Sequence, residues 1–592
     1  MRPSARVVSL FVLAIGLLCC TPNAAKAQAI EGDLNDDGFV GAQDLQIILS
    51  NWGQIVPIGE KSRGDLFPDG FVGLTDLSFL LLSWGQGTIP TPGGDASLGM
   101  NLSEIAYFSR ELVFVDAVKS ARRWVRTNPN GQPFDTGGTV VTDANGWPIL
   151  QPGQSAQTIL LSDKPANYPA GTYTVTFDGS GTLEFDFDAS NAQVTGSGTM
   201  TFNVGTATDN GILMRIETSN PANHVRNIRV WMPGYDANSP SSFHPDFTSK
   251  LAPFGVIRFM DWQQTNGSNV VEFEDMSNGK TFSLDNGDGV ALKYMIELCN
   301  QLDADAWFCM PHKASDAFVT QFATAVRDGL PNADPDLAIP ALEAERKIYV
   351  EWSNEVWNVS FPQQKWVTQQ SGAKVFADAW FEKWAEEAKK DFDIWAGIFA
   401  ANPNRLIRVA AGQQANVWVT RRLTEELDAI SGDFDAIACG AYFDERHAPF
   451  NASTTPQDII DNAYYETIPN TFAGQYQNHG DLAQQLTNNM GKTIPLLAYE
   501  GGQHYTVHGN SSRPYFQAFK DVQTYEHPVQ PDMYDAYTLN LEAFNNGGGS
   551  LYMAYSFVSK PGPFGAWGHL QFQNETGTQA PKYRALLDFN SE

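Results

Sequence analysis

The stretch Lys347-Ile-Tyr-Val-Glu-Trp-Ser-Asn-Glu355 decides the fold of this chain. It joins a short apolar run to two polar residues, Asn354 and Glu355, at the point where the run ends. Seven further stretches are short and apolar in the same way, with helical patterns between most of them: residues 98–106, 255–262, 304–312, 405–411, 436–442, 494–500 and 550–556. Such alternation predicts strand-helix units. Eight units predict a (β/α)8 TIM barrel over residues 98–592, an α/β fold with its active site at the carboxyl ends of the strands.

The alternation is interrupted between residues 125 and 235. Runs rich in Thr, Val and Phe with a period of two, at 173–177, 183–187 and 199–204, are separated there by Gly, Asp, Asn and Pro. This pattern is typical of β-strands with one buried face. We therefore expect a β-sandwich inserted after the first barrel unit, a strand at 98–106 followed by a helix at 114–121. The insert is either a carbohydrate-binding module or a passive decoration.

The first residues have the pattern of a secretory signal peptide. Arg2 and Arg6 precede an apolar run from residue 7 to 20, and small residues around Ala27 follow, as in cleaved signals. The run is shorter than the roughly 20 residues of a membrane-spanning helix, and no later stretch is apolar enough to span. The sequence predicts a signal peptide over residues 1–29 and a secreted protein, extracellular or attached to the cell surface, with no membrane span.

The net charge of the chain limits the classes of molecule that we expect it to bind. It carries 67 Asp and Glu against 38 Lys and Arg, a formal net charge of -29. Nucleic acid and anionic membranes repel such a chain, so we expect neither as a partner and favour a neutral substrate. Cys299, Cys309 and Cys439 remain after the signal peptide, all in apolar surroundings, and we do not expect a disulfide framework.

Residues 30–87 contain a duplication. The sequence Gly-Asp-Leu-Asn-Asp-Asp-Gly-Phe-Val-Gly from Gly32 returns as Gly-Asp-Leu-Phe-Pro-Asp-Gly-Phe-Val-Gly from Gly64. Alternate acidic residues around a glycine fit the calcium loop of an EF-hand, although a polar surface turn is the alternative. The predicted ligands are Asp33, Asn35, Asp37, the Phe39 carbonyl and Asp44 in the first loop, and Asp65, Asp69, the Phe71 carbonyl and Asp76 in the second. Phe67 stands where the second loop should offer an oxygen, so we expect weaker Ca2+ binding there.

Both copies end in Trp-Gly-Gln, and a Pro/Gly-rich linker follows at 88–97. In this the module resembles a dockerin, a small all-α module of paired EF-hand-like loops that attaches enzymes to cohesin domains. The resemblance implies calcium-dependent folding and a cohesin-like partner. In the family, side chains at loop positions 10 and 11 help to select that partner. They are Ala42-Gln43 in one loop and Leu74-Thr75 in the other, so they do not fix the type of partner.

Two glutamates stand where glycoside hydrolysis needs them. Glu355 follows the fourth apolar run and Glu500 ends the seventh, and glycoside hydrolysis uses two carboxylates that flank the scissile bond. This placement resembles clan A of the glycoside hydrolases, with an Asn-Glu pair after strand four and a Glu after strand seven. The resemblance implies Glu355 as acid/base and Glu500 as nucleophile of a retaining double displacement. It also implies a polysaccharide substrate, a β-linked plant or algal glycan, and no cofactor for catalysis.

The resemblance extends to four further residues. Arg258 matches the arginine that keeps the nucleophile ionised, because an adjacent cation lowers the pKa of a carboxyl group. Asn354 matches the residue that binds the sugar 2-hydroxyl, and His312 matches a substrate-binding histidine. Tyr442 matches the tyrosine that is hydrogen-bonded to the nucleophile.

Two positions depart from the clan pattern. Gly440 stands in place of the histidine that several families have on strand six. The eighth strand ends in Tyr555-Ser556-Phe557, where a tryptophan is usual. His447 and Trp567 are candidate replacements from loops.

Several nearby residues have two interpretations. Trp352 and Trp357 are either core residues or platforms on which a sugar ring stacks. Asp261 is either a loop anchor or part of a wall of the substrate site. Glu351 shares the strand of Glu355, but its offset of four residues places it deeper in the barrel, so we interpret it as structural.

A different class of function fits parts of the same sequence. The chain could be a carbohydrate-binding or scaffold-attached structural protein whose barrel has lost catalysis. Glu355 and Glu500 would then have no reason to face one cavity. An esterase is disfavoured, because no Gly-x-Ser-x-Gly elbow occurs.

Overall fold

The computed structural model describes residues 32, 34, 47–49, 51–59, 61–83, 98–164, 167–190, 192–195, 199–445 and 448–591. The chain divides into two compact units, residues 1–93 with 591–592 and residues 94–590. Each unit has an apolar core of its own. Three earlier expectations fall on residues outside the described ranges: the signal peptide at 1–29, the linker at 88–97, and His447.

The N-terminal unit contains a short 3-10 helix, η1 (Lys61–Arg63), and an α-helix, α2 (Leu74–Leu82). Its described part shares a small core of buried apolar residues: Leu34, Ile48, Val56, Leu66, Val72 and Leu80. The predicted ligands of the first calcium loop, Asp33, Asn35, Asp37, Phe39 and Asp44, lie outside the described residues. The second loop, residues 65–76, is described throughout.

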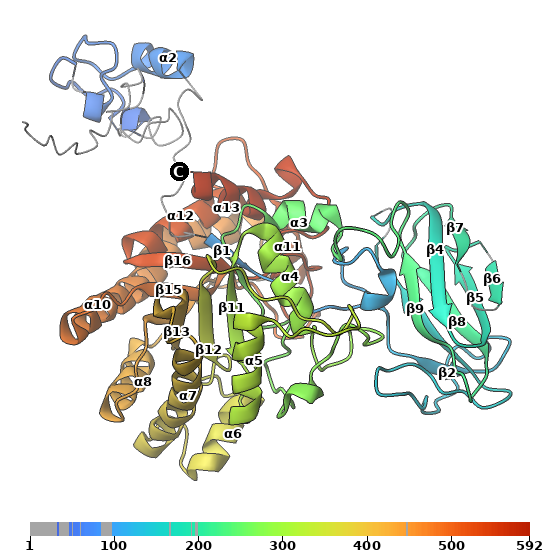
Figure 1. Ribbon diagram of the computed structural model, residues 1–592. Helices are drawn as coiled ribbons and strands as arrows, with labels where there is room; N and C mark the ends of the chain where they lie inside the picture. The colour runs from blue at the N-terminus through green and yellow to red at the C-terminus, as the bar shows by residue number, and fades with distance from the viewer. Residues whose placement is uncertain are drawn as a thin grey trace, which may run out of the picture. The chain divides into compact units, whose positions relative to one another are not determined.

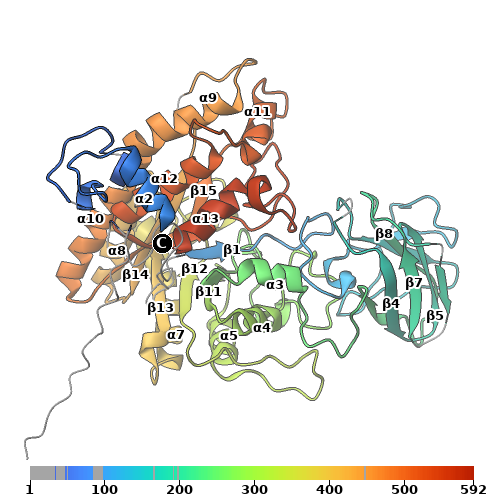
Figure 2. The ribbon, with the colours of Figure 1, turned by 90° about the horizontal axis from the view of Figure 1, so that it is seen from above.

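The second unit is built on a closed barrel of eight parallel strands that neighbour one another in chain order (Figures 1 and 2). The strands are β1 (Leu98–Asn101), β10 (Val256–Arg258), β11 (Asp305–Met310), β12 (Ile348–Trp352), β13 (Leu406–Ala411), β14 (Ala436–Phe443), β15 (Leu496–Gln503) and β16 (Gly549–Ala554). The last strand pairs with the first, which closes the barrel. All eight predicted strands are present, so the prediction of a (β/α)8 barrel is confirmed.

Helices surround the strands (Figure 2). They are α3 (Pro245–Leu251), α4 (Leu292–Leu302), α5 (Asp316–Asp328), α6 (Pro362–Ser371), α7 (Asp378–Ile398), α8 (Val417–Ala429), α9 (Pro456–Asp461), the π-helix η5 (Asn462–Phe472), α10 (Ala473–Met490), α11 (Phe516–Asp521), α12 (Met533–Asn546) and α13 (Pro581–Ser591). Helix α7 shows why they cover the barrel. Its buried side chains include Trp380, Trp384 and Trp395, which recur at helical spacing and form one apolar face.

The helix predicted at 114–121 is wrong. The structure has only a 3-10 turn there, η2 (Ala117–Ser120), and the helix between β1 and β10 is α3. The backbone before the turn makes long-range hydrogen bonds in place of helical ones. The Val115 N–H donates to the Ser242 carbonyl, and the Val115 carbonyl accepts from the Met232 N–H. Asp116 then accepts from the Val118 N–H. This segment joins the two ends of the inserted domain, and a helix could not make these bonds.

The insert folds as two antiparallel sheets. One sheet has the order β2 (Val125–Thr127), β3 (Ser155–Leu160), β8 (Ile212–Ser219), β5 (Gly181–Phe187) and β6 (Ala192–Thr195), and the other has β7 (Met200–Val204), β4 (Gly171–Asp178) and β9 (Arg226–Trp231). Side chains from both sheets share one core, in which the rings of Phe185 and Phe202 lie 4.4 Å apart. The alternating burial along β4 gives each sheet one buried face.

The insert is fixed to the barrel by polar and aromatic contacts. The ammonium of Lys119 donates to the carbonyls of Gly279 and Thr281 at 2.8 Å. Trp147 of the insert packs edge-on against Phe282 of the barrel at 5.1 Å. Phe282 belongs to the core of the insert, so the two parts share apolar contacts.

Alternation along the strands decides which side chains fill the barrel. Every second residue of a strand points to the same side, and the inward residues form an apolar plug: Val256, Met260, Trp307, Cys309, Tyr349, Val409, Ala411, Ala436, Ala438, Leu497, Tyr499, Leu551 and Met553. The same alternation points Asn101, Arg258 and Glu351 inward. Polar side chains therefore lie at the carboxyl ends of the strands, on top of the plug.

Among the described residues, no helix combines the length and the apolar composition that a membrane crossing requires.

Candidate active site

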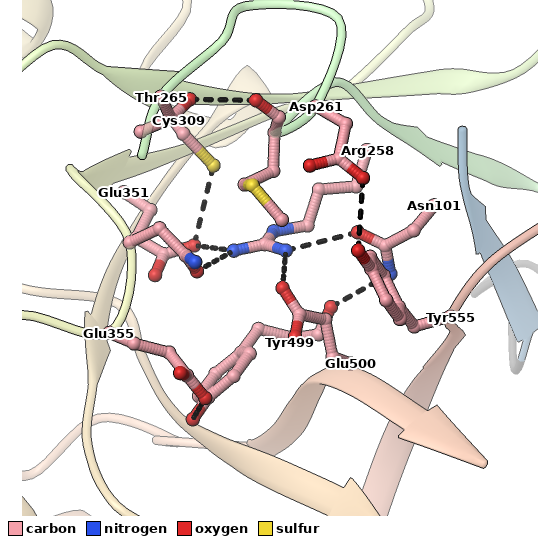
Figure 3. A network of polar contacts seen from close by, with 12 residues as sticks. Asn101, Arg258, Asp261, Thr265, Cys309, Glu351, Glu355, Tyr499, Glu500 and Tyr555 are labelled. Carbon is pink, nitrogen blue, oxygen red and sulfur yellow. Dashed lines mark hydrogen bonds and ion pairs between the residues drawn. The ribbon is translucent and has the colours of Figure 1, made fainter. Parts of the chain in front are cut away.

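Arg258 is the hub of the polar layer in the barrel (Figure 3). It ends β10, and its side chain is fully buried. Its Nη1 donates to Glu500 Oε1 at 2.8 Å and to Asn101 Oδ1 at 3.0 Å. Its Nη2 donates to Glu351 Oε2 at 2.8 Å and to Asn354 Oδ1 at 2.9 Å. The planar guanidinium thus joins residues from strands one, two, four and seven in one fixed arrangement.

Glu500 reaches this layer through a bulge in β15. Ala498 pairs with Cys439 and Glu500 pairs with Gly440, so Tyr499 has no partner of its own on β14. An extra residue of this kind lets two consecutive side chains turn to the same side of a sheet. Tyr499 accordingly packs in the barrel plug, while Glu500 accepts from Arg258 and from the Tyr442 hydroxyl, which lies 2.8 Å from its Oε2.

Glu355 lies just beyond β12, and its backbone is unusual. Ser353 and Glu355 have φ angles of 62° and 39°, in the left-handed region that costs energy for residues other than glycine. Asn354 between them accepts from Arg258. Glu355 lies on the other side of the guanidinium from Asp261 (Figure 3). A strained backbone at a strand end indicates a site where the position of a side chain matters more than local stability.

The carboxyl group of Glu355 has neutral hydrogen-bond partners. Asn358 Nδ2 donates to its Oε2 at 2.9 Å, and the Tyr499 hydroxyl lies 3.2 Å from its Oε1. Burial, and then the negative charge of Glu500, raise the pKa of Glu355 to about 8. The two carboxyl groups therefore influence each other electrostatically, and Glu355 is protonated near neutral pH.

Glu351 lies within the strand and belongs to the support of the guanidinium. It is 2% exposed, and its Oε2 accepts from Arg258 and from Trp307 Nε1, the latter at 3.1 Å. Burial raises its pKa and Arg258 opposes that rise. Its contacts with the interior of the barrel fit the structural role expected for it.

His312 follows β11 and is 3% exposed. Both ring nitrogens are buried without a hydrogen-bond partner among the described residues. Its ring lies 5.7 Å from that of Trp366, and burial lowers its pKa to about 4. The ring is therefore neutral, with one donor and one acceptor unused by the protein.

The two predicted tryptophans have different surroundings from the carboxylates. Trp352 is 5% exposed and belongs to the core between the barrel and its helices, with its ring 6.2 Å from that of Trp366. Trp357 is half-buried and packs against the same core. The structure thus brings Arg258, Asn354, Glu355, Tyr442 and Glu500 together, whereas these two side chains lie in apolar packing.

A group of aromatic side chains lies close to Tyr442, which donates to Glu500. The ring of Trp567 lies 5.8 Å from that of Tyr442 and 5.8 Å from that of Tyr555. His504, which follows β15, lies 4.8 Å from Trp567. Trp567, one of the candidate replacements from loops, thus lies among the aromatic side chains next to Tyr442.

Sequence reasoning missed Asn101, Tyr499 and His504 as members of this site. Asn101 ends the short strand β1, and its Nδ2 donates to the Tyr499 carbonyl at 3.0 Å. The one local signal for it is its place at the end of a predicted strand. Tyr499 stands next to Glu500, where regular alternation would point it to the opposite side.

The carboxylates of the second predicted calcium loop, Asp65 and Asp76, accept hydrogen bonds from the backbone around them. Asp65 Oδ2 accepts from the backbone N–H groups of Gly59 and Gly70, at 2.6 and 3.1 Å. Asp76 accepts from the N–H groups of Phe67 and Gly73, at 2.9 and 2.8 Å. No group of three or more His, Cys, Asp or Glu side chains in the described residues could hold a metal ion.

The second loop is also tied to the helix that follows it. Asp76 caps the start of α2, and Asp69 accepts from the Phe71 N–H at 2.9 Å. The ring of Phe67 lies 5.4 Å from that of Phe79, so the residue in the third position packs on the helix. The carboxylates of the loop are thus bonded to nearby backbone N–H groups, and Ca2+ binding by this loop stays a prediction.

No family model and no curated protein sequence matches the chain. Among solved structures it is similar to a GH51 arabinofuranosidase from Xanthomonas axonopodis pv. citri, with 13% identity and a TM-score of 0.34 over 55% of this chain and 63% of that one. A family 51 alpha-L-arabinofuranosidase from Bifidobacterium longum has 13% identity and a TM-score of 0.40, over 60% and 68%. Xylanase10C from Cellvibrio japonicus has 10% identity and a TM-score of 0.32, over 80% and 98%. The chain thus spans less than two thirds of the Xanthomonas enzyme, and at such scores the function has to be inferred from the site itself.

Proposed function

We propose that this protein is a secreted glycoside hydrolase that cleaves a polysaccharide by a retaining double displacement. The observation that carries this proposal is the difference between two carboxyl groups of one site. Glu500 is held by a buried guanidinium and a tyrosine hydroxyl. Glu355 has neutral partners and a raised pKa. A carboxyl group held by a cation, together with a second one whose pKa is raised, fits the nucleophile and the acid of the first step of glycoside cleavage.

In the proposed first step Glu500 attacks the anomeric carbon and Glu355 gives its proton to the departing oxygen. The products are a glycosyl-enzyme and the shortened chain. In the second step Glu355, now ionised, removes a proton from water, and the resulting attack frees Glu500. Arg258 and Tyr442 keep the Glu500 oxygens in line throughout. No metal or organic cofactor takes part in this scheme.

Two further residues would hold the sugar. Asn354 is fixed by Arg258 on its oxygen and by Asn266, which accepts from its Nδ2 at 3.2 Å. That leaves its second N–H for a sugar hydroxyl. His312 brings one donor and one acceptor that the protein leaves unused. The strongly acidic chain favours a neutral glycan, and we propose a β-linked plant or algal polysaccharide.

The proposal is tested with polysaccharides and with 2-deoxy-2-fluoro glycosides that bear good leaving groups. We expect release of sugar with retained configuration, observed by NMR. We also expect a covalent adduct on the peptide that contains Glu500, observed by mass spectrometry. Polysaccharide binding without any turnover would contradict this proposal and favour the carbohydrate-binding alternative.

We also propose that residues 30–87 attach the enzyme to a cohesin-like partner and that both loops bind Ca2+, the second more weakly. The duplicated sequence supports this, together with the separate core of the N-terminal unit. The two-sheet insert is proposed as a β-sandwich decoration of the barrel. Chelation of Ca2+ should abolish docking and leave hydrolysis unchanged. Loss of hydrolysis on chelation would show that the module is not independent of the barrel.

A further inference from the structure

One carboxyl group close to the nucleophile has no part in the proposed mechanism. Asp261 follows β10, and its Oδ2 accepts a hydrogen bond of 3.0 Å from the hydroxyl of Tyr555, which follows β16. Its Oδ1 receives no hydrogen bond from any residue in the described part of the chain. Figure 3 shows this pair beside Arg258, on the side away from Glu355.

Ionising a carboxyl group at this position costs free energy. Burial, and then the negative charge of Glu500, raise the pKa of Asp261 to about 7. An ionised acid is unfavourable there, because it is both desolvated and close to another carboxylate. An asparagine would accept from Tyr555 equally well without this cost. Groups held in an unfavourable environment next to reacting atoms are typical of sites that bind or transform a ligand.

The surroundings indicate which ligand group Asp261 would bind. The Tyr555 ring stands 6.4 Å from that of Tyr442, the residue that donates to Glu500. Asp261 and Glu500 both lie beside Arg258 (Figure 3), close enough for the charge of Glu500 to act on Asp261, so a sugar attacked by Glu500 would approach Asp261. The unused Oδ1 is an acceptor, and the group on a sugar ring that donates to an acceptor is a hydroxyl.

We propose that Asp261 and Tyr555 form a hydroxyl clamp, which binds one hydroxyl of the sugar unit attacked by Glu500 and restricts that unit to neutral sugars. The clamp rests on the proposed function and extends it to the class of sugar. Tyr555 fixes the carboxyl group by bonding Oδ2, and Oδ1 accepts from the sugar. A sugar that lacks this hydroxyl leaves the acceptor unpaired in the bound state, which costs binding free energy, so this contact discriminates between sugars.

The same arrangement disfavours a sugar that carries a carboxylate or a sulfate. Such a group would approach Glu500 and also Asp261, which repels it when ionised, because like charges at close range repel. Both terminal nitrogens of Arg258 are committed to protein oxygens. Lys313, which stands next to His312 in the sequence, donates to Asn269 Oδ1 at 3.0 Å. The cations of the site are thus engaged by the protein.

The experiment compares kcat/KM for a panel of 4-nitrophenyl glycosides. The panel contains neutral hexosides and pentosides, the matching uronides, and the monodeoxy derivatives of the best neutral substrate. For the wild-type chain we expect one deoxy derivative to lose about tenfold or more in kcat/KM. Uronides should be worse than their neutral counterparts by at least a similar factor.

The variants then assign this selectivity to the clamp. Asp261→Asn should lower kcat/KM for the full sugar by about tenfold or more, with little further loss for the critical deoxy derivative. Tyr555→Phe should reduce the same discrimination in part, because Asp261 loses its fixed orientation. The matched control is Glu104→Gln, which removes an exposed negative charge near Asp261 without removing the acceptor. It should preserve the discrimination.

Each outcome separates the clamp from the proposed function. Hydrolysis with equal discrimination among deoxy sugars in the wild type and both variants would overturn the clamp and leave the hydrolase intact. Uronides cleaved as well as neutral sugars would do the same. A wild-type chain that cleaves no glycoside and forms no adduct on Glu500 would overturn the hydrolase and the clamp together. If Asp261→Asn does not fold, as judged by its thermal melting, Tyr555→Phe carries the test.

Discussion

Glu355 and Glu500 are the same residue type at the ends of two strands of one barrel, yet their surroundings differ in kind. Glu500 meets a guanidinium and a phenol through charged and neutral hydrogen bonds. Glu355 meets an amide and a phenol. A bulge in β15 positions Glu500. Left-handed backbone in the segment after β12 positions Glu355.

This comparison teaches that the role of a carboxyl group is set by its neighbours. A buried cation stabilises the ionised form, whereas burial without one stabilises the protonated form. The negative charge of Glu500 adds to the second effect, since it raises the pKa of Glu355. Substituting the partners of one carboxyl group at a time should therefore change the catalytic contribution of that group separately from the other.

The largest effect is expected for Glu500→Gly. Removal of the nucleophile should lower kcat on the order of 10^5-fold. Azide should restore turnover by occupying the space, and its product should have the opposite anomeric configuration. Glu351→Gln is the matched control, because Glu351 also accepts from Arg258 but is not the nucleophile. If azide does not restore the turnover of Glu500→Gly, Glu500 is not the nucleophile. If azide instead restores the turnover of Glu351→Gln, Glu351 has that role.

Glu355→Gln should have the next largest effect, and one that depends on the leaving group. Activity on glycosides with poor leaving groups should fall about 10^3-fold, since they need the proton. Formation of the glycosyl-enzyme from 2,4-dinitrophenyl glycosides should fall far less. The comparison is made by pre-steady-state kinetics on both substrates. Equal losses on the two would remove Glu355 from the acid/base role.

Arg258→Lys keeps the charge and removes the forked geometry. We expect kcat to fall about 100-fold, because an ammonium cannot hold Glu500, Glu351 and Asn354 together. A matched control is Arg229→Lys in the insert, where the guanidinium is bonded to Asp336 at 2.8 Å. That variant should keep the activity of the wild type. If the two substitutions cost the same in kcat, the hub does not act through the active site.

The smallest effect concerns the pH profile. Glu355 must be protonated to act as acid, so kcat/KM should fall as pH rises through about 8. The hydrogen bond from Asn358 favours the ionised form and lowers the pKa of Glu355. Asn358→Ala should therefore raise that pKa and move the alkaline limb upward by up to about one unit. A downward shift would contradict the assignment of this limb to Glu355.

The strands of the barrel were predictable because each is short, apolar and bounded by turn residues, and Glu500 stands at the end of such a run. The bulge at Tyr499 was not predictable, since regular alternation places neighbouring residues on opposite sides. The segment at 114–121 misled for another reason. Its apolar residues serve contacts with residues 232 and 242, and such long-range pairing leaves no periodic signal in the local sequence.

The residues that contact the two glutamates also differ in how far the sequence predicts them. Arg258, Tyr442 and Asn354 could be named from the sequence because the clan pattern contains them. Asp261 remained ambiguous, because its hydrogen bond comes from Tyr555, far along the chain. A contact of this range follows from barrel closure and from no local motif.

Closure of the barrel also has a consequence for how the protein is made. Strand β1 is the first barrel strand to leave the ribosome, and one of its partners is β16, near the end of the chain. The whole insert and six strands are synthesised while that edge of β1 has no neighbour. Unpaired edges invite wrong pairing, and contacts between distant segments form slowly. We expect a nascent chain that stops before β16 to hold a folded insert beside an open, aggregation-prone sheet.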